Sequence, residues 1–106
     1  MDVTVVDVPE RGRFEIRSGQ QVVGLASYHV DGRTMTLPHT EIDPAMGGRG
    51  FGTRLVAGVL AAARERGLHV HPYCSFVRHY LAEHPEELDL VTDEDRPHFG
   101  LATVDS

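Results

Sequence analysis

The chain has 106 residues and a formal net charge of −6 at pH 7. This length corresponds to one domain and excludes two catalytic domains in series. The acidic balance excludes a general nucleic-acid or membrane-surface binder, because such proteins need a basic footprint. It leaves room for a local basic pocket that binds an anionic ligand.

Cysteine content and hydropathy narrow the class of protein further. The only cysteine, Cys74, excludes an intramolecular disulfide. No apolar run approaches the roughly 18 residues of a spanning helix, and the first residues lack the basic and apolar regions of a signal peptide. We therefore expect a cytoplasmic protein that binds neither membranes nor nucleic acid.

The first 42 residues predict an antiparallel meander. Runs of β-branched residues, or of alternating apolar and polar residues, predict strands at residues 3–8, 13–18, 22–30 and 33–42. Asp31 and Gly32 predict a type I′ turn between the last two strands, with a positive φ at both residues. Pro38 cannot donate to a sheet ladder, so it predicts an edge, a bulge or a splayed strand.

The remainder predicts a glycine-rich loop, a helix, a strand and a second helix. Apolar residues recur at helical spacing from 55 to 63, and Gly67 fits the stop of that helix. Residues 68–73 predict a strand. Ser75 is expected to cap a second helix at 76–84, which Pro85 ends. We expect a last short strand at 88–91, a single domain over 1–94 and a partly ordered tail over 95–106.

Four glycines lie within six positions, where the fourth strand leads into the first helix. Glycines let backbone N–H groups approach a ligand closely, and a helix N-terminus attracts anions, so phosphate is the natural ligand. Arg49 and Arg54 would add charge-assisted contacts. The loop lacks the Lys-Ser/Thr pair of a Walker A motif. The alternative is a flexible connector between a strand and a helix.

The loop resembles the acetyl-CoA loop of the GNAT superfamily of N-acetyltransferases, in which backbone amides wrap a pyrophosphate. Gly50 and Gly52 match the last two positions of that motif, and Gly47 stands where it has Gln or Arg. A small single-domain GNAT-like subgroup is similar to this chain from the Phe14 strand to about Val91. The similarity rests on His39-Thr40-Glu41-Ile42, Asp43-Pro44, Gly48-Arg49-Gly50-Phe51-Gly52, Pro72-Tyr73-Cys74-Ser75-Phe76 and His84-Pro85-Glu86.

This resemblance implies an α/β (α+β) fold, with a twisted mixed β-sheet, an antiparallel N-terminal meander and flanking helices in one compact domain. It also implies acetyl-CoA as the cofactor, held in a splay between the strands at 36–42 and 68–73. No metal is expected. The residues expected to bind the cofactor are Ile42, Gly47, Gly48, Arg49, Gly50, Phe51, Gly52, Thr53, Arg54 and Cys74.

Acetyl transfer to an amine needs a positioned thioester, a polarised carbonyl and a deprotonated amine. His39 and Glu41 are two residues apart on a strand and share a face, so either is a candidate general base. Larger GNAT enzymes place a carboxylate on this strand. The alternative is a structural histidine beside an exposed glutamate.

Cys74 lies between the end of a strand and the start of the second helix. A helix N-terminus favours the thiolate, and in the similar subgroup this position faces the acetyl end of the cofactor. Cys74 is therefore a candidate nucleophile or acid, and the alternative is a small buried apolar residue. His69 and His71 share a strand face, but without a clear third ligand they predict polar strand positions rather than a metal site.

The resulting hypothesis is an acetyl-CoA-dependent N-acetyltransferase that acts on an unidentified amine, either a small molecule or a protein amine. The negative net charge favours a cationic acceptor. The alternative is a CoA- or acyl-CoA-binding module with weak or no catalysis, since the short chain has no obvious insertion for substrate binding. A third hypothesis is an interaction domain that keeps only the fold.

Overall fold

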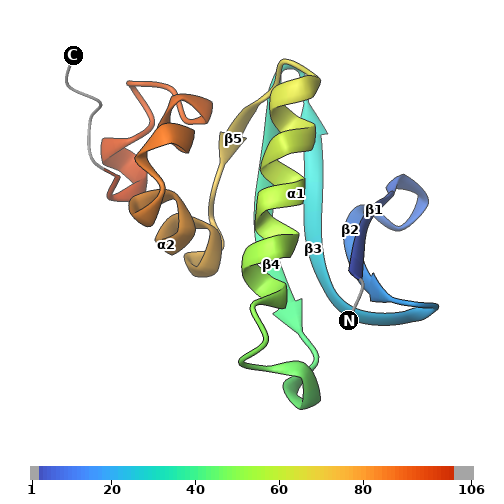
Figure 1. Ribbon diagram of the computed structural model, residues 1–106. Coiled ribbons are helices and arrows are strands. Elements are labelled where there is room, and N and C mark those ends of the chain that lie inside the picture. The colour runs from blue at the N-terminus through green and yellow to red at the C-terminus, as the bar shows by residue number, and fades with distance from the viewer. Residues whose placement is uncertain (1–2, 102–106) are drawn as a thin grey trace.

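The computed structural model describes residues 3–101, which form one five-stranded mixed sheet and the helices that flank it (Figure 1). The sheet order is β1-β2-β3-β4-β5. The first four strands are antiparallel neighbours, and β5 runs parallel to β4. This confirms the expected α/β fold with its N-terminal meander. The strands are β1 (Val3–Val8), β2 (Arg13–Ser18), β3 (Gln21–Asp31), β4 (Thr34–Ile42) and β5 (His69–His71).

The turn between β3 and β4 differs from the expected type I′ turn. Asp31 pairs with Thr34 in the ladder, so the two loop residues are Gly32 and Arg33. Gly32 has a φ of 62°, and no non-glycine residue in the described range has a positive φ. The strand pairing extends one residue further than the turn motif suggested, which moves the glycine to the first loop position, as in a type II′ hairpin.

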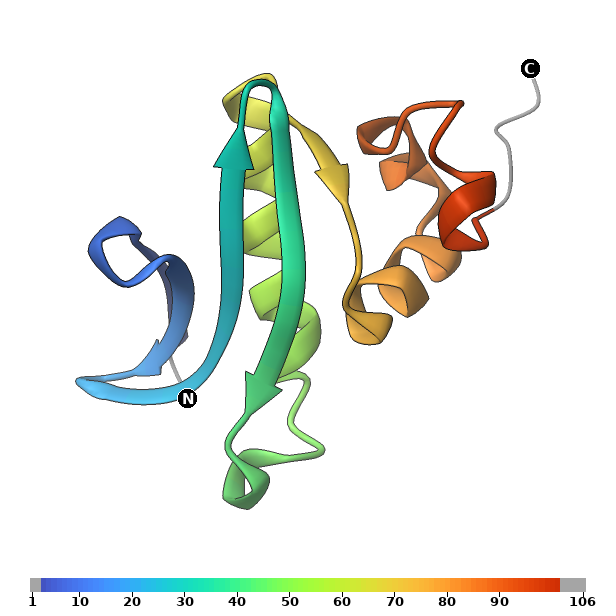
Figure 2. The ribbon, with the colours of Figure 1, turned by 180° about the vertical axis from the view of Figure 1, so that it is seen from behind.

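Helix α1 (Phe51–Glu65) covers one face of β3 and β4, and no helix of residues 3–101 covers the opposite face (Figures 1 and 2). Leu55 and Leu60 of this helix are fully buried. The helix ends as the sequence predicts: Gly67 takes a φ of 69°, and the Leu68 N–H donates to the Ala63 carbonyl at 2.9 Å. This is a Schellman C-cap.

Helix α2 (Ser75–Glu83) and the C-terminal segment lie beyond β5 (Figure 1). The strand expected at 88–91 is wrong, because Pro85–Leu90 forms a 3-10 helix. The buried Arg96 explains the difference, since its guanidinium donates to the carbonyls of Leu88 and Val91 at 2.9 and 2.8 Å. Those carbonyls would otherwise need the partners that a neighbouring strand supplies.

Part of the segment expected to be a tail packs onto the domain. Phe99 and Leu101 belong to the hydrophobic core, and Pro97–Phe99 forms a short 3-10 helix. Residues 102–106 lie outside the described residues. Within residues 3–101, no helix has the length and apolar character needed to cross a membrane.

Strands β4 and β5 separate soon after they meet. Their pairing joins only Thr34–Thr36 to His69–His71. Opposite β3, the register shifts where β4 has one residue more than its partner, at Leu37 and Pro38. The Cys74 N–H still donates to the Leu37 carbonyl at 2.9 Å. From Pro38 onward, the edge of β4 that faces away from β3 has no strand partner within residues 3–101, so the bulge and the splay predicted from Pro38 are both confirmed.

Candidate functional site

The chain between β4 and α1 forms a short 3-10 helix (Pro44–Met46) followed by an exposed glycine loop. Gly48 and Gly50 have φ values of 80° and 75°, in the left-handed region that favours glycine. Gly50 is the N-cap of α1 and has no side chain to cap it. The first-turn N–H groups of α1 therefore have no partner within the helix and point toward the loop.

A cleft of about 290 Å³ opens at this loop and at the start of α1. Of the residues expected to bind a cofactor, seven line it, and Arg49, Arg54 and Cys74 do not. Both arginines are exposed, and neither forms an ion pair with a carboxylate of residues 3–101. Their charges are therefore available to an anion. The lining residues are Ile42, Met46, Gly47, Gly48, Gly50, Phe51, Gly52, Thr53 and Phe76.

Gly52 has a packing reason to be glycine in addition to any ligand. A Cβ at this position would lie 2.6 Å from the Cζ atom of Phe76. The ring of Phe76 therefore lies against the first turn of α1 and forms one wall of the cleft, while 41% of the residue stays exposed. Phe76 was not among the residues predicted to bind a cofactor. The signal for its position was the pairing of an aromatic residue on one helix with a glycine at the start of the other.

Cys74 is the N-cap residue of α2, a place the sequence analysis gave to Ser75. The chain turns into the helix one residue earlier than expected because the Cys74 N–H is held by the Leu37 carbonyl of β4. Burial raises the pKa of the Cys74 thiol, but the Thr40 hydroxyl and the backbone N–H groups of Val77 and Phe76 outweigh it, so the pKa lies below its usual value.

The Thr40 hydroxyl is buried and makes no hydrogen bond of ordinary geometry with any residue in the described range. It lies on β4 beside the sulfur of Cys74, where its proton can turn toward a thiolate. A buried hydroxyl without a partner costs free energy, so this position is suited to a polar group that binds there. Thr40 was not among the residues predicted to act.

His39 and Glu41 are neighbours on the exposed face of β4. Their Nε2 and Oε1 atoms are 3.7 Å apart, and the two side chains are 58% and 64% exposed. Ile42, between Glu41 and the loop, packs against the core beneath α1. Because side chains alternate along a strand, His39 and Glu41 point to the opposite face from Thr40 and Ile42. The structure therefore brings Cys74 together with Thr40, and not with His39 or Glu41 on one face.

His71 and His84 both contact neighbouring side chains. Nε2 of His71 lies 2.8 Å from a carboxylate oxygen of Asp95, and this hydrogen bond lowers the pKa of Asp95. The ring of His84 stacks on that of Tyr80 with a centroid separation of 3.9 Å. The first contact joins the C-terminal segment to β5, and the second packs the end of α2, so both serve the fold.

Comparisons with known proteins agree with this arrangement. The family model GCN5-related N-acetyl-transferase matches residues 13–90. The solution structure of a GCN5-like protein of Staphylococcus aureus, titled as an N-acetyltransferase candidate, superposes with a TM-score of 0.62 at 25% identity, covering 85% of this chain and 86% of that one. A search of curated proteins finds no significant match.

Two further structures show the likeness of fold alone. The ribosomal-protein-S18-alanine N-acetyltransferase of Escherichia coli has a TM-score of 0.54 at 20% identity, over 57% of this chain and 39% of that one. A GNAT-family structure from Desulfovibrio desulfuricans has a TM-score of 0.51 at 20% identity, over 57% and 41%. Since the family model matches well over half of the residues, this chain belongs to the GCN5-related N-acetyltransferase family.

Proposed function

We propose that the protein is an acetyl-CoA-dependent N-acetyltransferase that acetylates an amine. One observation carries the proposal: a 15-residue helix begins at a glycine loop with its first-turn N–H groups open to a cleft, beside an edge of β4 that no strand within residues 3–101 covers. The first feature suits a pyrophosphate and the second suits an amide-containing chain such as pantetheine.

The residues present fit such a cofactor. The N–H groups of Phe51, Gly52 and Thr53 would hold the pyrophosphate, and Arg49 and Arg54 would add charge. Ile42 and Phe76 supply apolar walls to the same cleft. When bound, the cofactor supplies an activated acetyl thioester. The glycines at 48 and 50 keep the loop backbone in the left-handed conformation that leaves the helix end open.

Thr40 and Cys74 are the residues placed to act at the acetyl end. The Thr40 hydroxyl can donate a hydrogen bond to a carbonyl oxygen or to a sulfur anion in the splay. The lowered pKa of Cys74 keeps a larger fraction of its thiol deprotonated near neutral pH than in a free cysteine. His39 or Glu41, on the exposed face, would take the proton that the amine loses.

The second candidate, a CoA-binding module without catalysis, is favoured by one observation. His39 and Glu41 are more than half exposed, so neither is desolvated in the way that tunes many catalytic bases. The two functions predict different results with amines but the same result with the cofactor.

The experiment is a thermal scan with acetyl-CoA, followed by chromatographic assay of CoA release with a panel of amines. A ligand that binds only the native state at about 100 times its Kd stabilises it by about 2.7 kcal/mol. A thermal shift with amine-dependent CoA release supports the enzyme. A shift with no release on any amine supports the binding module, and no shift at all refutes both.

A further inference from the structure

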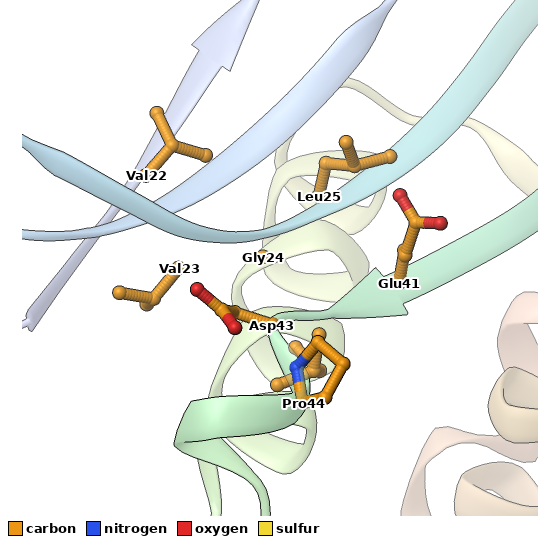
Figure 3. Close-up of a pocket in the computed structure, with 8 residues that line it drawn as sticks. Val22, Val23, Gly24, Leu25, Glu41, Asp43 and Pro44 are labelled. Atoms are coloured by element: carbon orange, nitrogen blue, oxygen red, sulfur yellow. The ribbon is translucent and has the colours of Figure 1, made fainter.

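A second cleft, of about 280 Å³, lies where the end of β4 passes β3 (Figure 3). We call it the β3–β4 groove. Ile42 lines both this groove and the cleft at the glycine loop, so the two are separated by the thickness of one strand. The groove is lined by Val22, Val23, Gly24, Leu25, Glu41, Ile42, Asp43 and Pro44.

The walls of the β3–β4 groove are mostly apolar. Val22 is 39% exposed and adds apolar surface to the groove. Leu25 pairs directly with Glu41 across the ladder and stands on the same face of the sheet. Gly24 lies at the base of the groove, where a Cβ would be 2.5 Å from the Cδ1 atom of Ile42, so the Ile42 side chain packs against its backbone and closes the base with apolar surface. Such walls suit the methylene groups of an alkyl chain.

Two carboxylates stand at the groove. Neither Glu41 nor Asp43 pairs with an arginine of residues 3–101, and Nε2 of His39 lies 3.7 Å from a carboxylate oxygen of Glu41. Asp43 accepts a hydrogen bond from the Ala45 N–H at 3.0 Å, which fixes its carboxylate. Two residues apart on extended chain, Glu41 and Asp43 are separated by about 7 Å along the backbone.

We propose that the β3–β4 groove binds the acceptor of the proposed acetyl transfer, and that this acceptor is an alkyl diamine or polyamine. The inference rests on the proposed function for the reaction, but the binding itself does not. Asp43 pairs with one ammonium, the apolar walls cover the methylene chain, and Glu41 with His39 receives the second nitrogen. That nitrogen is the one that reacts, because His39 and Glu41 belong to the stretch of β4 whose outer edge has no strand partner within residues 3–101.

Transfer then forms the amide N–C bond and breaks the thioester C–S bond. The reacting ammonium loses two protons in the process. One goes to the departing sulfur, and the other passes through Glu41 or His39 to water. A monoamine would make only one of the two ionic contacts, so the groove discriminates by the second charge of the acceptor.

The test measures binding of 1,4-diaminobutane and 1-aminobutane to the full chain by calorimetry. We expect the diamine to bind at least fivefold more tightly than the monoamine. Glu41→Gln and Asp43→Asn should each weaken diamine binding about three- to fivefold, and about tenfold together, as expected for partly exposed ion pairs. The controls are Asp31→Asn and Glu65→Gln, which change the net charge equally at exposed sites outside the groove.

The proposal is overturned if the diamine and the monoamine bind equally, if the groove variants bind the diamine as the parent does, or if the control variants lose as much affinity. The last result would mean that only the overall negative charge attracts the amine. Acetyl-CoA binding is measured separately by thermal shift. If acetyl-CoA gives no thermal shift while the diamine still binds, the proposed function is refuted and the groove assignment remains intact.

Discussion

Arg78 donates a hydrogen bond from its guanidinium to the backbone carbonyl of Tyr73, the residue immediately before Cys74. The same nitrogen donates to the Pro72 carbonyl at 3.2 Å, and the Arg78 N–H bonds to the Cys74 carbonyl at 3.1 Å. One residue on the first turn of α2 therefore holds the three peptide units that place the Cys74 thiol. Nothing in the sequence motif pointed to this role.

Arg78→Gln should raise the pKa of the Cys74 thiol toward its ordinary value of about 8.5 and slow its alkylation at neutral pH, because the turn that aims the sulfur at the helix N–H groups loosens. Cys74 is the only thiol, so ultraviolet absorbance of the thiolate reports on it alone. Arg33→Gln, at the exposed β3–β4 turn, is the matched control. A lower melting temperature with an unchanged thiol pKa would show that Arg78 only supports the fold.

Gly50→Val should destabilise the fold by about 1–2 kcal/mol, because a side chain is strained at its φ of 75°. It should also weaken acetyl-CoA binding, since the branched side chain stands in the open space where a phosphate would approach. Gly19→Val is the control, because Gly19 has a φ of 61° in a hairpin outside the cleft. If the two variants lose the same stability and both keep the parent's affinity, the loop assignment is wrong.

Gly52→Ala should destabilise the protein by about 1–3 kcal/mol, because its Cβ would lie 2.6 Å from the Phe76 ring. Phe76→Leu should remove most of this cost. In that background alanine becomes neutral or stabilising, since it is a better helix residue than glycine by about 1 kcal/mol. A double-mutant cycle of chemical unfolding measures the coupling. Additive effects would mean that the ring moves aside without cost.

Local signals in the sequence were sufficient to predict the structure where a single residue determines the backbone conformation. Gly67 predicts the end of α1 and Pro38 predicts the splay, since each acts through its own φ or its missing N–H. The glycine loop and the following helix were predictable for the same reason.

Tertiary contacts decided the rest. Residues 88–91 look like a strand, but the guanidinium of Arg96 takes the carbonyls that a strand partner would need. The shared face of His39 and Glu41 follows from their spacing, yet the bulge at Leu37 and Pro38 decides that this is the exposed face of the sheet. A bulge changes which side every later residue faces, and its exact position depends on the partner strand.

Stability should fall at acid pH partly through Glu15, which is 3% exposed and lies between two arginines. Hydrogen bonds from Arg17 and Arg13 hold its pKa below the ordinary value. A depressed carboxylate pKa contributes stability above the unfolded pKa of about 4.3, and that contribution is lost as the pH falls through the folded value.

Glu15→Gln should therefore lower the free energy of unfolding at pH 7 and flatten its decline below about pH 4.3. Chemical unfolding at several pH values measures both effects. Asp89→Asn is the comparison: Arg64 also lowers the pKa of Asp89, but that carboxylate is 62% exposed, so solvent screens the pair and the change should be smaller. Equal acid sensitivity in the parent and in Glu15→Gln would contradict the role of Glu15.

Cys74 offers the sharpest test of the proposed chemistry. The protein's thiol should react with an alkylating reagent faster than free cysteine at neutral pH, because the pKa of Cys74 is lowered at the start of α2. Acetyl-CoA should shield the thiol, because the proposed acetyl end of the cofactor lies beside Cys74. Cys74→Ala should reduce turnover while leaving CoA affinity within about twofold, because the pyrophosphate contacts would come from the loop and α1.

Cys74→Ser then separates two roles, because a hydroxyl replaces a hydrogen-bonding thiol but is a poor nucleophile at its own pKa. Activity retained in serine and lost in alanine indicates hydrogen bonding or proton transfer beside Thr40. Activity lost in both, with an acetylated Cys74 found by mass spectrometry in the parent, indicates covalent transfer. If Cys74→Ala keeps full activity and the thiol of the parent protein is inert to the reagent, Cys74 only packs against its neighbours. Thr40, His39 and Glu41 would then be the groups left to carry the reaction.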